Sequence, residues 1–470
     1  MTDRLMRKAA WIAIAASLAL AGCKTTPTEP PTLDVPAGNA AADNLALERW
    51  WTKFNDPTLT AYVDEALAHN LDLAAALARI ETARAQVKLA SADLYPSVNL
   101  GVDANRSRQF VPGFNNLVTN NYRVAIDASY EVDLWGKYRT ATRAAQEDLL
   151  ATQYARETVQ TIVAADVART YFQLLAADAQ LRLLYDTLKS REETVNLQRD
   201  RYQSGVIGEY DFAQAEAERA AVAADIATTR RAVGELEGAL AVLLGRSPRE
   251  VFQPQLAHDA TADQLIAVPT VPTDLPSNML ERRPDIRQSE SQLAAASLRI
   301  DRARADYFPS LTLTGSFGRE SDALSNLFKG PAGIWSIGAG LLQPLIGLKA
   351  IEANVDAATA RRQEAVIDYE RSVQNAFRDT HDALVENSTA RDALTAQGQR
   401  RERLARALEL SDLRYKAGYS PYLEVLDVQR QLLQAQTLEI VAARDARIAI
   451  VDLAKALGGG WDYTTELSAR

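Results

Sequence analysis

The chain has 470 residues, of which 47% are hydrophobic and 24% are charged, so it can bury a large core. Its formal net charge of -9 and the lack of clustered Lys and Arg argue against a nucleic-acid partner, because a phosphate-binding face needs concentrated positive charge. The single cysteine, Cys23, excludes an internal disulfide.

Residues 1–22 have the layout of a signal peptide. Basic residues precede an apolar run, residues 11–20, which is too short to span a bilayer. The Leu-Ala-Gly-Cys sequence that ends at Cys23 resembles the lipobox of bacterial lipoproteins, which implies cleavage before Cys23 and acylation of this cysteine, for example with palmitate. Lys24 resembles the sorting position of lipoproteins sent to the outer membrane, and the Pro-rich start of residues 23–55 predicts an extended tether. The alternative is an ordinary signal peptide that ends near a free cysteine.

The next region, residues 56–245, begins with a short helical part and then changes its hydrophobic period to two. The alternation predicts a strand pair at about 97–133, each strand having one apolar and one polar face. The polar face of the second strand carries Arg123, Asp127, Glu131 and Asp133. Strands of this length suit a tilted membrane strand, and the polar segment 106–120 predicts an outer-facing loop between them.

The period then becomes helical. Residues 137–204 contain neither Gly nor Pro, and apolar residues recur every seven positions, which predicts one long coiled-coil helix of roughly 100 Å. The members of this seam are Val167, Leu174, Leu181, Leu188, Val195 and Tyr202. A second apolar stripe predicts a return helix over residues 208–244.

The remaining chain repeats this order after a Pro-rich linker region, residues 246–283, which cannot form a long helix. The second region, residues 284–457, is predicted to contain a helix (284–306), a strand pair (about 310–343), a long helix (349–417) and a return helix (421–457). Residues 458–470 form a tail.

An internal duplication explains this order. The sequence ADLYPSVNL around Tyr95 returns as ADYFPSLTL around Phe308, and this spacing defines the offset of the repeat. The same offset aligns Arg201, Tyr202 and Gly205 with Arg414, Tyr415 and Gly418. The sequence therefore predicts a mainly α protein with a small membrane β part, in which duplicated long helical hairpins form a tunnel. An unpaired strand edge cannot lie in hydrocarbon, so the four strands of one chain must join a barrel shared by several copies.

Two motifs carry a family resemblance. The sequence from Trp50-Trp51 through Asn70-Leu71, and the stretch Glu281 to Ile286 (ERRPDI), resemble the signatures of the TolC and OprM group of outer-membrane efflux proteins. The resemblance implies a homotrimer with a shared 12-stranded barrel and a periplasmic helical tunnel. It also implies outer-membrane lipid as surroundings, and a periplasmic adaptor (a membrane fusion protein) and an inner-membrane transporter as partners. The expected function is a passive exit duct of a tripartite efflux pump, without a cofactor beyond the lipid on Cys23.

The helix turns are candidate docking sites. Gly205 and Gly418 follow the long helices at the position where a left-handed C-cap is expected. Because the tips of the family contact the adaptor, the resemblance implies docking through Gly205, Val206, Gly418 and Tyr419.

Acidic residues just beyond the tips are candidate gate residues. Asp211, Glu424 and Asp427 match positions that constrict the pore entrance in the family, and in a trimer each would form a ring of like charges able to select cations. The alternative for each is a solvated helix face or a charge that complements the helix dipole. Tyr415 matches a family tyrosine that bonds to the acidic residue of the neighbouring helix pair, here Asp211. Some relatives carry a latching arginine where this chain has Ser420, so a looser closure through Tyr415 alone is our hypothesis.

Enzymatic chemistry is not predicted. The three histidines are scattered singly and the one cysteine is an acylation site, so the sequence shows no metal-ligand cluster. Two other functions stay open: a periplasmic adaptor or scaffold lipoprotein, and an outer-membrane duct for type I protein secretion. Two complete helical units that each enclose a strand pair favour a channel over an adaptor.

Overall fold

The computed structural model describes residues 49–111, 114–258 and 283–459. The predicted signal peptide, Cys23, the tether up to residue 48, most of the linker region and the tail from residue 460 lie outside the described residues. The chain divides into two compact units. The first unit holds Thr82–Leu150 and Glu290–Tyr369, and the second holds the described residues of 34–81, 151–289 and 370–470.

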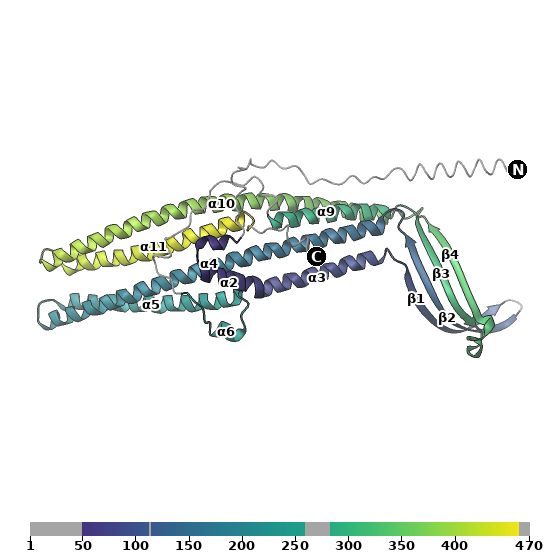
Figure 1. Ribbon diagram of the computed structural model, residues 1–470, viewed down its shortest axis with the longest axis horizontal. Helices are drawn as coiled ribbons and strands as arrows, with labels where there is room; N and C mark the ends of the chain where they lie inside the picture. Colours follow the sequence, from purple (N-terminus) through teal and green to yellow (C-terminus); the bar gives the residue numbers. More distant parts are fainter. Residues whose placement is uncertain (1–48, 112–113, 259–282, 460–470) are drawn as a thin grey trace. The chain divides into compact units, whose positions relative to one another are not determined.

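The first unit contains one four-stranded antiparallel sheet (Figure 1). Its strands are β1 (Ser97–Val111), β2 (Phe114–Val132), β3 (Ser310–Ser321) and β4 (Gly333–Leu342), in the order β1-β2-β3-β4. β2 of the first repeat pairs with β3 of the second from Tyr122↔Ser321 to Val132↔Leu311. The two repeats therefore share one sheet.

The predicted loop at residues 106–120 is wrong. The ladder between β1 and β2 continues through Arg106↔Asn120 and closes at Val111↔Phe114. Polar side chains do not end a strand by themselves, because an exposed side chain can face water while its backbone stays paired. Between β3 and β4 the chain instead forms two short 3-10 turns, η3 (Leu324–Asn326) and η4 (Gly330–Ala332).

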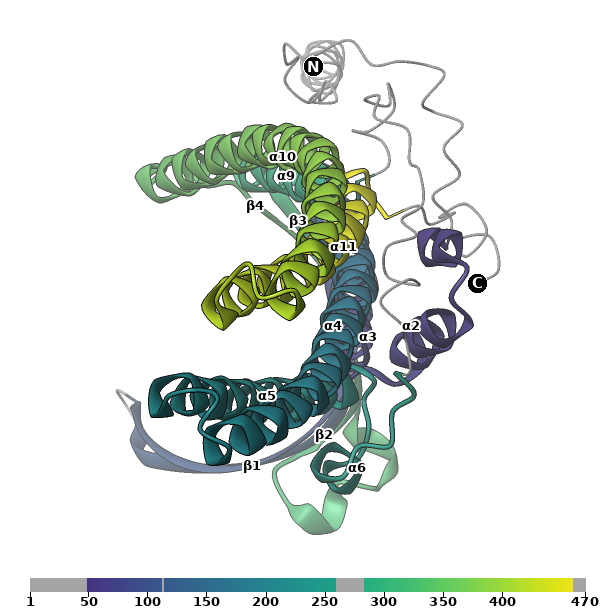
Figure 2. The same ribbon diagram turned by 90° about the vertical axis from the view of Figure 1, so that its left-hand side faces the viewer.

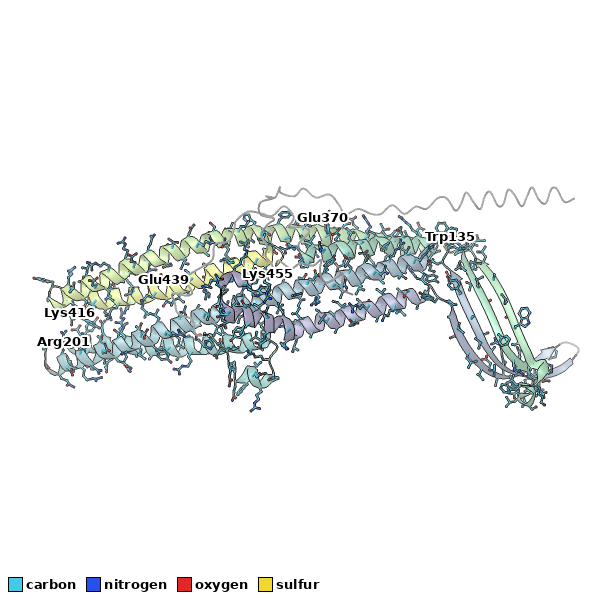
Figure 3. All side chains as sticks on the ribbon, in the orientation of Figure 1. Trp135, Arg201, Glu370, Lys416, Glu439 and Lys455 are labelled. Atoms are coloured by element: carbon cyan, nitrogen blue, oxygen red, sulfur yellow. The ribbon has the colours of Figure 1, made fainter. Side chains whose placement is uncertain are left out.

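An aromatic pair fixes the junction between the sheet and the helices of this unit. Trp135 stacks on Phe308 with ring centroids 4.8 Å apart, and its indole N–H donates to the carbonyl of Pro309 at 2.8 Å. The alternation placed Asp133 on the polar face of the second strand, but β2 ends one residue earlier, at Val132. The Asp133 carboxylate accepts from the backbone N–H groups of Tyr138 and Arg139, so it supplies partners to the first turn of the following helix. Figure 3 labels Trp135 at this junction.

Six helices carry most of the remaining chain. They are α3 (Leu71–Ala92), α4 (Lys137–Gln203), α5 (Glu209–Leu243), α9 (Pro284–Ala305), α10 (Lys349–Lys416) and α11 (Tyr422–Ala456). The ends of the last five differ from the sequence-based bounds by no more than one residue. Among the described residues, no helix combines the length and apolar character that a membrane crossing requires.

The second unit is built on two helical hairpins, α4 with α5 and α10 with α11, whose members lie side by side (Figure 2). A large apolar core forms where these helices meet η2 (Trp50–Phe54) and α2 (Pro57–His69). Asp56 accepts hydrogen bonds from the N–H groups of Thr58 and Leu59, at 2.9 and 3.0 Å, and from the hydroxyl of Tyr171 at 2.9 Å. The two tryptophans are thus part of the core, and Asp56 both caps α2 and bonds it to α4.

The duplication extends to individual contacts of the second unit. Asn70, just before α3, donates to the carbonyl of Leu243 in the last turn of α5 at 2.8 Å. Arg283, the equivalent position of the second repeat and just before α9, donates to the carbonyl of Ala456 at 2.8 Å. In each repeat a polar side chain therefore joins the end of the return helix to the start of the shorter helix, which stacks the two end to end.

Candidate functional site

One face of the sheet exposes a continuous set of apolar side chains. The register places them in rows across the strands, Leu100–Ile126–Phe317–Trp335 and Val98–Ala128–Gly315–Ile337. The large side chains in these rows are all exposed, and Ile337 reaches 85%. An apolar surface of this extent marks contact with a membrane or with another chain. Alternation of exposed apolar and polar positions along each strand is typical of membrane strands.

The opposite face of the sheet is polar and linked by Arg123. The guanidinium of Arg123 donates to the Asp127 carboxylate at 2.5 Å and to the Ser316 hydroxyl at 2.9 Å, and lies 3.8 Å from Asp103. These contacts join β1, β2 and β3. Such a face tolerates water and suits the inside of a channel.

The two hairpin tips have the same backbone geometry. Gly205 and Gly418 have φ of 73° and 79°, in the left-handed region that glycine tolerates best. The N–H of Val206 bonds to the carbonyl of Arg201, and that of Tyr419 to the carbonyl of Arg414, both at 2.9 Å, as in a Schellman C-cap. Val206 is 70% and Tyr419 81% exposed, so each tip ends in an apolar or aromatic side chain that faces solvent.

The predicted gate residues lie in or next to the first turns of the return helices. Asp211 and Glu424 are acidic residues of the first turns of α5 and α11, and neither helix has a side-chain N-cap. Both carboxylates therefore also complement the helix dipole. Glu424 lies 3.4 Å from Arg414, whereas Asp427 is exposed and accepts from Gln431 at 2.7 Å.

The expected bond between Tyr415 and Asp211 is not formed in this chain. The hydroxyl of Tyr415 accepts a hydrogen bond from Arg201, whose guanidinium lies over the Tyr415 ring, 5.5 Å from its centroid. The physical reason is that Arg201, in the last turn of α4, offers a cation to both the hydroxyl and the ring. The buried Oγ of Ser420 has no hydrogen-bond partner among the described residues, so Ser420 makes no side-chain hydrogen bond between the hairpins of one chain.

Two further contacts between the hairpins were not predicted. Arg430 on α11 binds Glu218 on α5, with Nε 2.8 Å from Oε1, and Arg191 on α4 donates to Gln429 on α11. Together with Arg201 and Tyr415, they tie the α4/α5 hairpin to the α10/α11 hairpin close to the tips. A single amino-acid sequence gives no signal for such pairs, because their members lie in different repeats and far apart along the chain.

His258, in the described part of the linker region, also has partners that the sequence did not indicate. One ring nitrogen faces Asp178 on α4, and the other lies 2.9 Å from Glu237 on α5. The hydrogen bond to Asp178 raises the pKa of His258 above its ordinary value, against the opposing effect of burial. Beside it, the Tyr62 hydroxyl donates to the carbonyl of Ala257 and accepts from its N–H. The linker region is therefore anchored to the first repeat by a charged and a neutral contact.

This anchor should loosen as the pH rises. The folded-state pKa of His258 is raised above the unfolded value of about 6.5. The contribution of His258 to stability is therefore complete below pH 6.5, and it is lost as the pH rises through the higher folded-state pKa. Hydrogen exchange of the peptide around Ala257, corrected for the intrinsic effect of pH, should show protection that falls with pH. His258→Gln keeps a donor but cannot titrate, so its protection should not depend on pH. A flat profile in the unmodified protein would contradict the assignment.

The comparisons with known proteins agree with this geometry. The family model described as outer membrane efflux protein matches the chain twice, over residues 62–246 and 275–459. The two matched segments are related by the same offset that aligns Gly205 with Gly418, which is the offset of the internal repeat.

Similar proteins cover nearly the whole chain. The toluene efflux pump outer membrane protein TtgC of Pseudomonas putida is 33% identical over 474 residues, covering 98% of this chain and 96% of TtgC. The pyoverdine export outer membrane protein OpmQ of Pseudomonas aeruginosa is also 33% identical, covering 97% and 98%. The cation efflux system protein CusC of Escherichia coli is 31% identical, covering 94% and 98%.

Solved structures share the fold. The CmeC outer membrane channel of Campylobacter jejuni superposes with a TM-score of 0.85 at 27% identity, covering 93% of this chain and 96% of CmeC. The MtrE outer membrane channel of Neisseria gonorrhoeae, in its open state, gives 0.81 at 33% identity, covering 93% and 98%. These matches confirm the predicted fold class, which is mainly helical, duplicated and carries four antiparallel strands per chain.

Proposed function

Because the chain belongs to the outer membrane efflux protein family, we propose that it is the exit duct of a tripartite pump, assembled from three copies. It is an outer membrane channel of an efflux pump and not an enzyme. The observation that carries the proposal is the sheet, which exposes one apolar face while its other face is polar. Such a surface inserts into a membrane and leaves a wet interior.

The free edges of the sheet support a shared barrel. Within the described residues, β1 and β4 each pair on one side only, and unpaired backbone groups cost several kcal/mol each in hydrocarbon, on the order of 2–7. Pairing β4 of one copy with β1 of the next removes every edge. A barrel of about eight strands is filled by its own side chains. A duct therefore needs more than two copies of this four-stranded sheet, and three copies are the smallest number that suffices.

A lipid on Cys23 would attach each copy to the same membrane. The support is the Leu-Ala-Gly-Cys sequence at the end of an apolar run, with no other cysteine in the chain to compete for acylation. Mass spectrometry of the amino-terminal peptide should detect acyl chains on Cys23 and lose them in Cys23→Ser. An unmodified thiol in the protein isolated from membranes would rule the anchor out.

The hairpin tips are proposed to form both the gate and the docking surface. Asp211, Glu424 and Asp427 would form acidic rings, and Tyr415 would hold the gate closed, here through Arg201. Val206 and Tyr419, each presented by a glycine turn at Gly205 or Gly418, would contact the periplasmic adaptor. An inner-membrane transporter would then deliver and choose the cargo.

Conductance of the purified protein in planar bilayers tests the duct and its acidic rings together. We expect stable pores that prefer cations, because rings of carboxylates attract them. The double variant Glu424→Gln with Asp427→Asn should lower the cation-to-anion permeability ratio, while Glu409→Gln, an exposed carboxylate on α10 that pairs with Arg406, should not. Pores that never form, or a protein that stays monomeric in detergent, would refute the shared barrel.

The cargo follows from the transporter rather than from this chain. The similar proteins are named for toluene efflux, pyoverdine export and cation efflux, so one channel architecture serves chemically unrelated substrates. Susceptibility profiling of a deletion strain, with the gene restored on a plasmid, identifies the substrate class. A strain with unchanged susceptibility to drugs and metals would argue against efflux as the main task.

A further inference from the structure

The ionisable side chains of the four strands are sorted between the two faces of the sheet. The register places every acidic residue of these strands on the polar face, together with Arg123. The acidic residues are Asp103, Asp127, Glu131 and Glu320. The apolar face carries Arg106, Arg108 and Arg319, and within the described strands it carries no acidic residue. One face of the sheet therefore combines apolar rows with positive charge.

The three arginines lie toward the turns of the hairpins, Arg106 and Arg108 close to the turn between β1 and β2, and Arg319 close to the end of β3. Arg106 and Arg108 are exposed, and within the described residues neither has an ion pair or a hydrogen bond. Arg319 is half-buried and donates to the carbonyl of Lys329 at 3.1 Å. An arginine on a lipid-facing strand is costly at the bilayer midplane but is tolerated near the interface, where its long side chain reaches the headgroups. The arginines thus mark the headgroup end of the apolar face.

The duplication superposes the two β-hairpins residue by residue. Val98 pairs with Ala128 in the first hairpin, and Leu311 pairs with Leu341 in the second. Each member of the second pair is related to its counterpart in the first by the offset of the internal repeat. The hairpins therefore have the same register, and β1 and β2 are equivalent to β3 and β4.

This equivalence predicts how two copies pair in a shared barrel. Within one chain, β2 meets β3 with Tyr122 opposite Ser321. The residues at the equivalent positions are Trp335 on β4 and Arg108 on β1. When the contact between copies repeats the contact between the two hairpins of one chain, Trp335 of one copy lies opposite Arg108 of the next.

The duplication also retains an arginine at one position of the apolar face. Arg106 and Arg319 are related by the offset of the repeat, so identical copies would alternate them around the barrel. The row that begins at Val98 reaches Gly315, which lies beyond Leu311, the equivalent of Val98. The rows therefore shift toward the turns from strand to strand, and each arginine lies nearer to the headgroups than its row neighbour on the preceding strand.

We propose that this rim, formed by Arg319 of one copy and by Arg106 and Arg108 of the next around Trp335, binds membrane lipids through their phosphate groups. Trp335 is 74% exposed in the single chain. Guanidinium groups donate paired hydrogen bonds to phosphate oxygens, and an indole ring is favoured at the level of the headgroups. The proposal deepens the proposed function, because it requires that the sheet lie in the membrane and be shared between copies.

The apolar rows beside the arginines favour a lipid over other anions. Phe317 lies opposite Trp335 in one of these rows and is 72% exposed, so acyl chains would continue from the arginines over the apolar face. A free phosphate would contact the arginines alone, and an acidic protein segment would leave the apolar rows uncovered. A phosphorylated lipid satisfies both the charged and the apolar surface.

Native mass spectrometry of the detergent-purified oligomer tests the site, with lipid A that carries two phosphates as the probe. We expect bound lipid in the unmodified protein and about tenfold weaker binding in the double variant Arg106→Gln with Arg108→Gln, because charged donors are lost. Arg106→Lys with Arg108→Lys keeps both charges but not the paired donors, so its binding should lie between the two. Asp103→Asn removes a charge from the same strand on the opposite face and should leave lipid binding unchanged.

Two further probes identify the source of the phosphate. Lipid A with a single phosphate should bind more weakly than the form with two, and inorganic phosphate at the same concentration should not displace the lipid. The assignment is overturned if the glutamine variant binds lipid normally, if Asp103→Asn changes binding as much as that variant does, or if inorganic phosphate displaces the lipid.

Cross-linking separates failure of the lipid site from failure of the duct. In a Cys23→Ser background, Ser336→Cys and Ser107→Cys lie opposite each other across the proposed contact and should form a disulfide between copies, whereas β2 and β3 separate them within one chain. Ser336→Cys with Asp103→Cys, which corresponds to a slipped register, should not link. Linked oligomers without lipid binding refute the lipid site only. Conducting pores in which the slipped pair links instead refute the shared rim and leave the duct, and a protein that neither links nor conducts refutes the duct itself.

Discussion

Replacing Ile337 with Arg should remove most of the folded protein from the outer membrane, whereas the same replacement at Ser336 should leave it in place. The two residues are neighbours on β4, so their side chains point to opposite faces of the sheet. Ile337 lies in the exposed apolar row of Val98 and Ala128, and Ser336 lies in the polar row of Asp127 and Ser316. Arg on the lipid face costs about 2–4 kcal/mol per chain near the bilayer centre, and a shared barrel repeats this cost in every copy.

Membrane fractionation with urea extraction measures the result, and the oligomer that resists detergent gives a second measure. Ser336→Arg is the matched control, because it adds the same side chain to the same strand on the face that already carries Arg123. Equal loss in both variants would mean that the strand itself, rather than its lipid face, is disturbed. Equal retention would mean that the apolar face does not contact lipid.

The repeat and the helices of this protein could be predicted because their signals are local. Three signals can each be read from neighbouring residues: the absence of Gly and Pro over residues 137–204, the seven-residue apolar repeat, and the change to a period of two. Because the two repeats are related by a constant offset, each pattern in the first repeat is supported by the same pattern in the second, and the family model matches at the same offset. The C-cap glycines Gly205 and Gly418 were predicted for the same reason, since a left-handed cap follows from a glycine at the end of a helix.

The contacts between distant segments could not be predicted in this way. Arg201 could have paired with Asp211 on sequence alone, and only the structure places Tyr415 within its reach. His258 appeared isolated because Asp178 is 80 residues away in the chain. The strands at residues 106–120 were missed because their polar side chains resemble a loop, although the backbone ladder does not depend on them. Sequence patterns thus predict elements, whereas side-chain partners depend on how those elements pack.

Phe172→Ala should be among the most destabilising single changes in the second unit. Phe172 on α4 is fully buried, with its ring 4.8 Å from that of Phe54 and 5.2 Å from the guanidinium of Arg447. Truncation leaves a cavity among these groups and removes the aromatic face over which a buried cation lies, so we expect a loss of about 3–5 kcal/mol of unfolding free energy. Because Phe54 belongs to the Trp-Trp motif, the same change should also loosen α2.

Phe252→Ala provides the control, since Phe252 in the short helix α6 (Pro248–Phe252) is 84% exposed and its truncation creates no cavity. Thermal unfolding in detergent should show a lower midpoint for Phe172→Ala and an unchanged one for Phe252→Ala. Hydrogen exchange should locate the change, with lost protection in α2 but retained protection at the hairpin tips, whose C-caps do not contact this core. If α2 kept its protection while the midpoint fell, the aromatic motif would not be the element that holds α2 against α4.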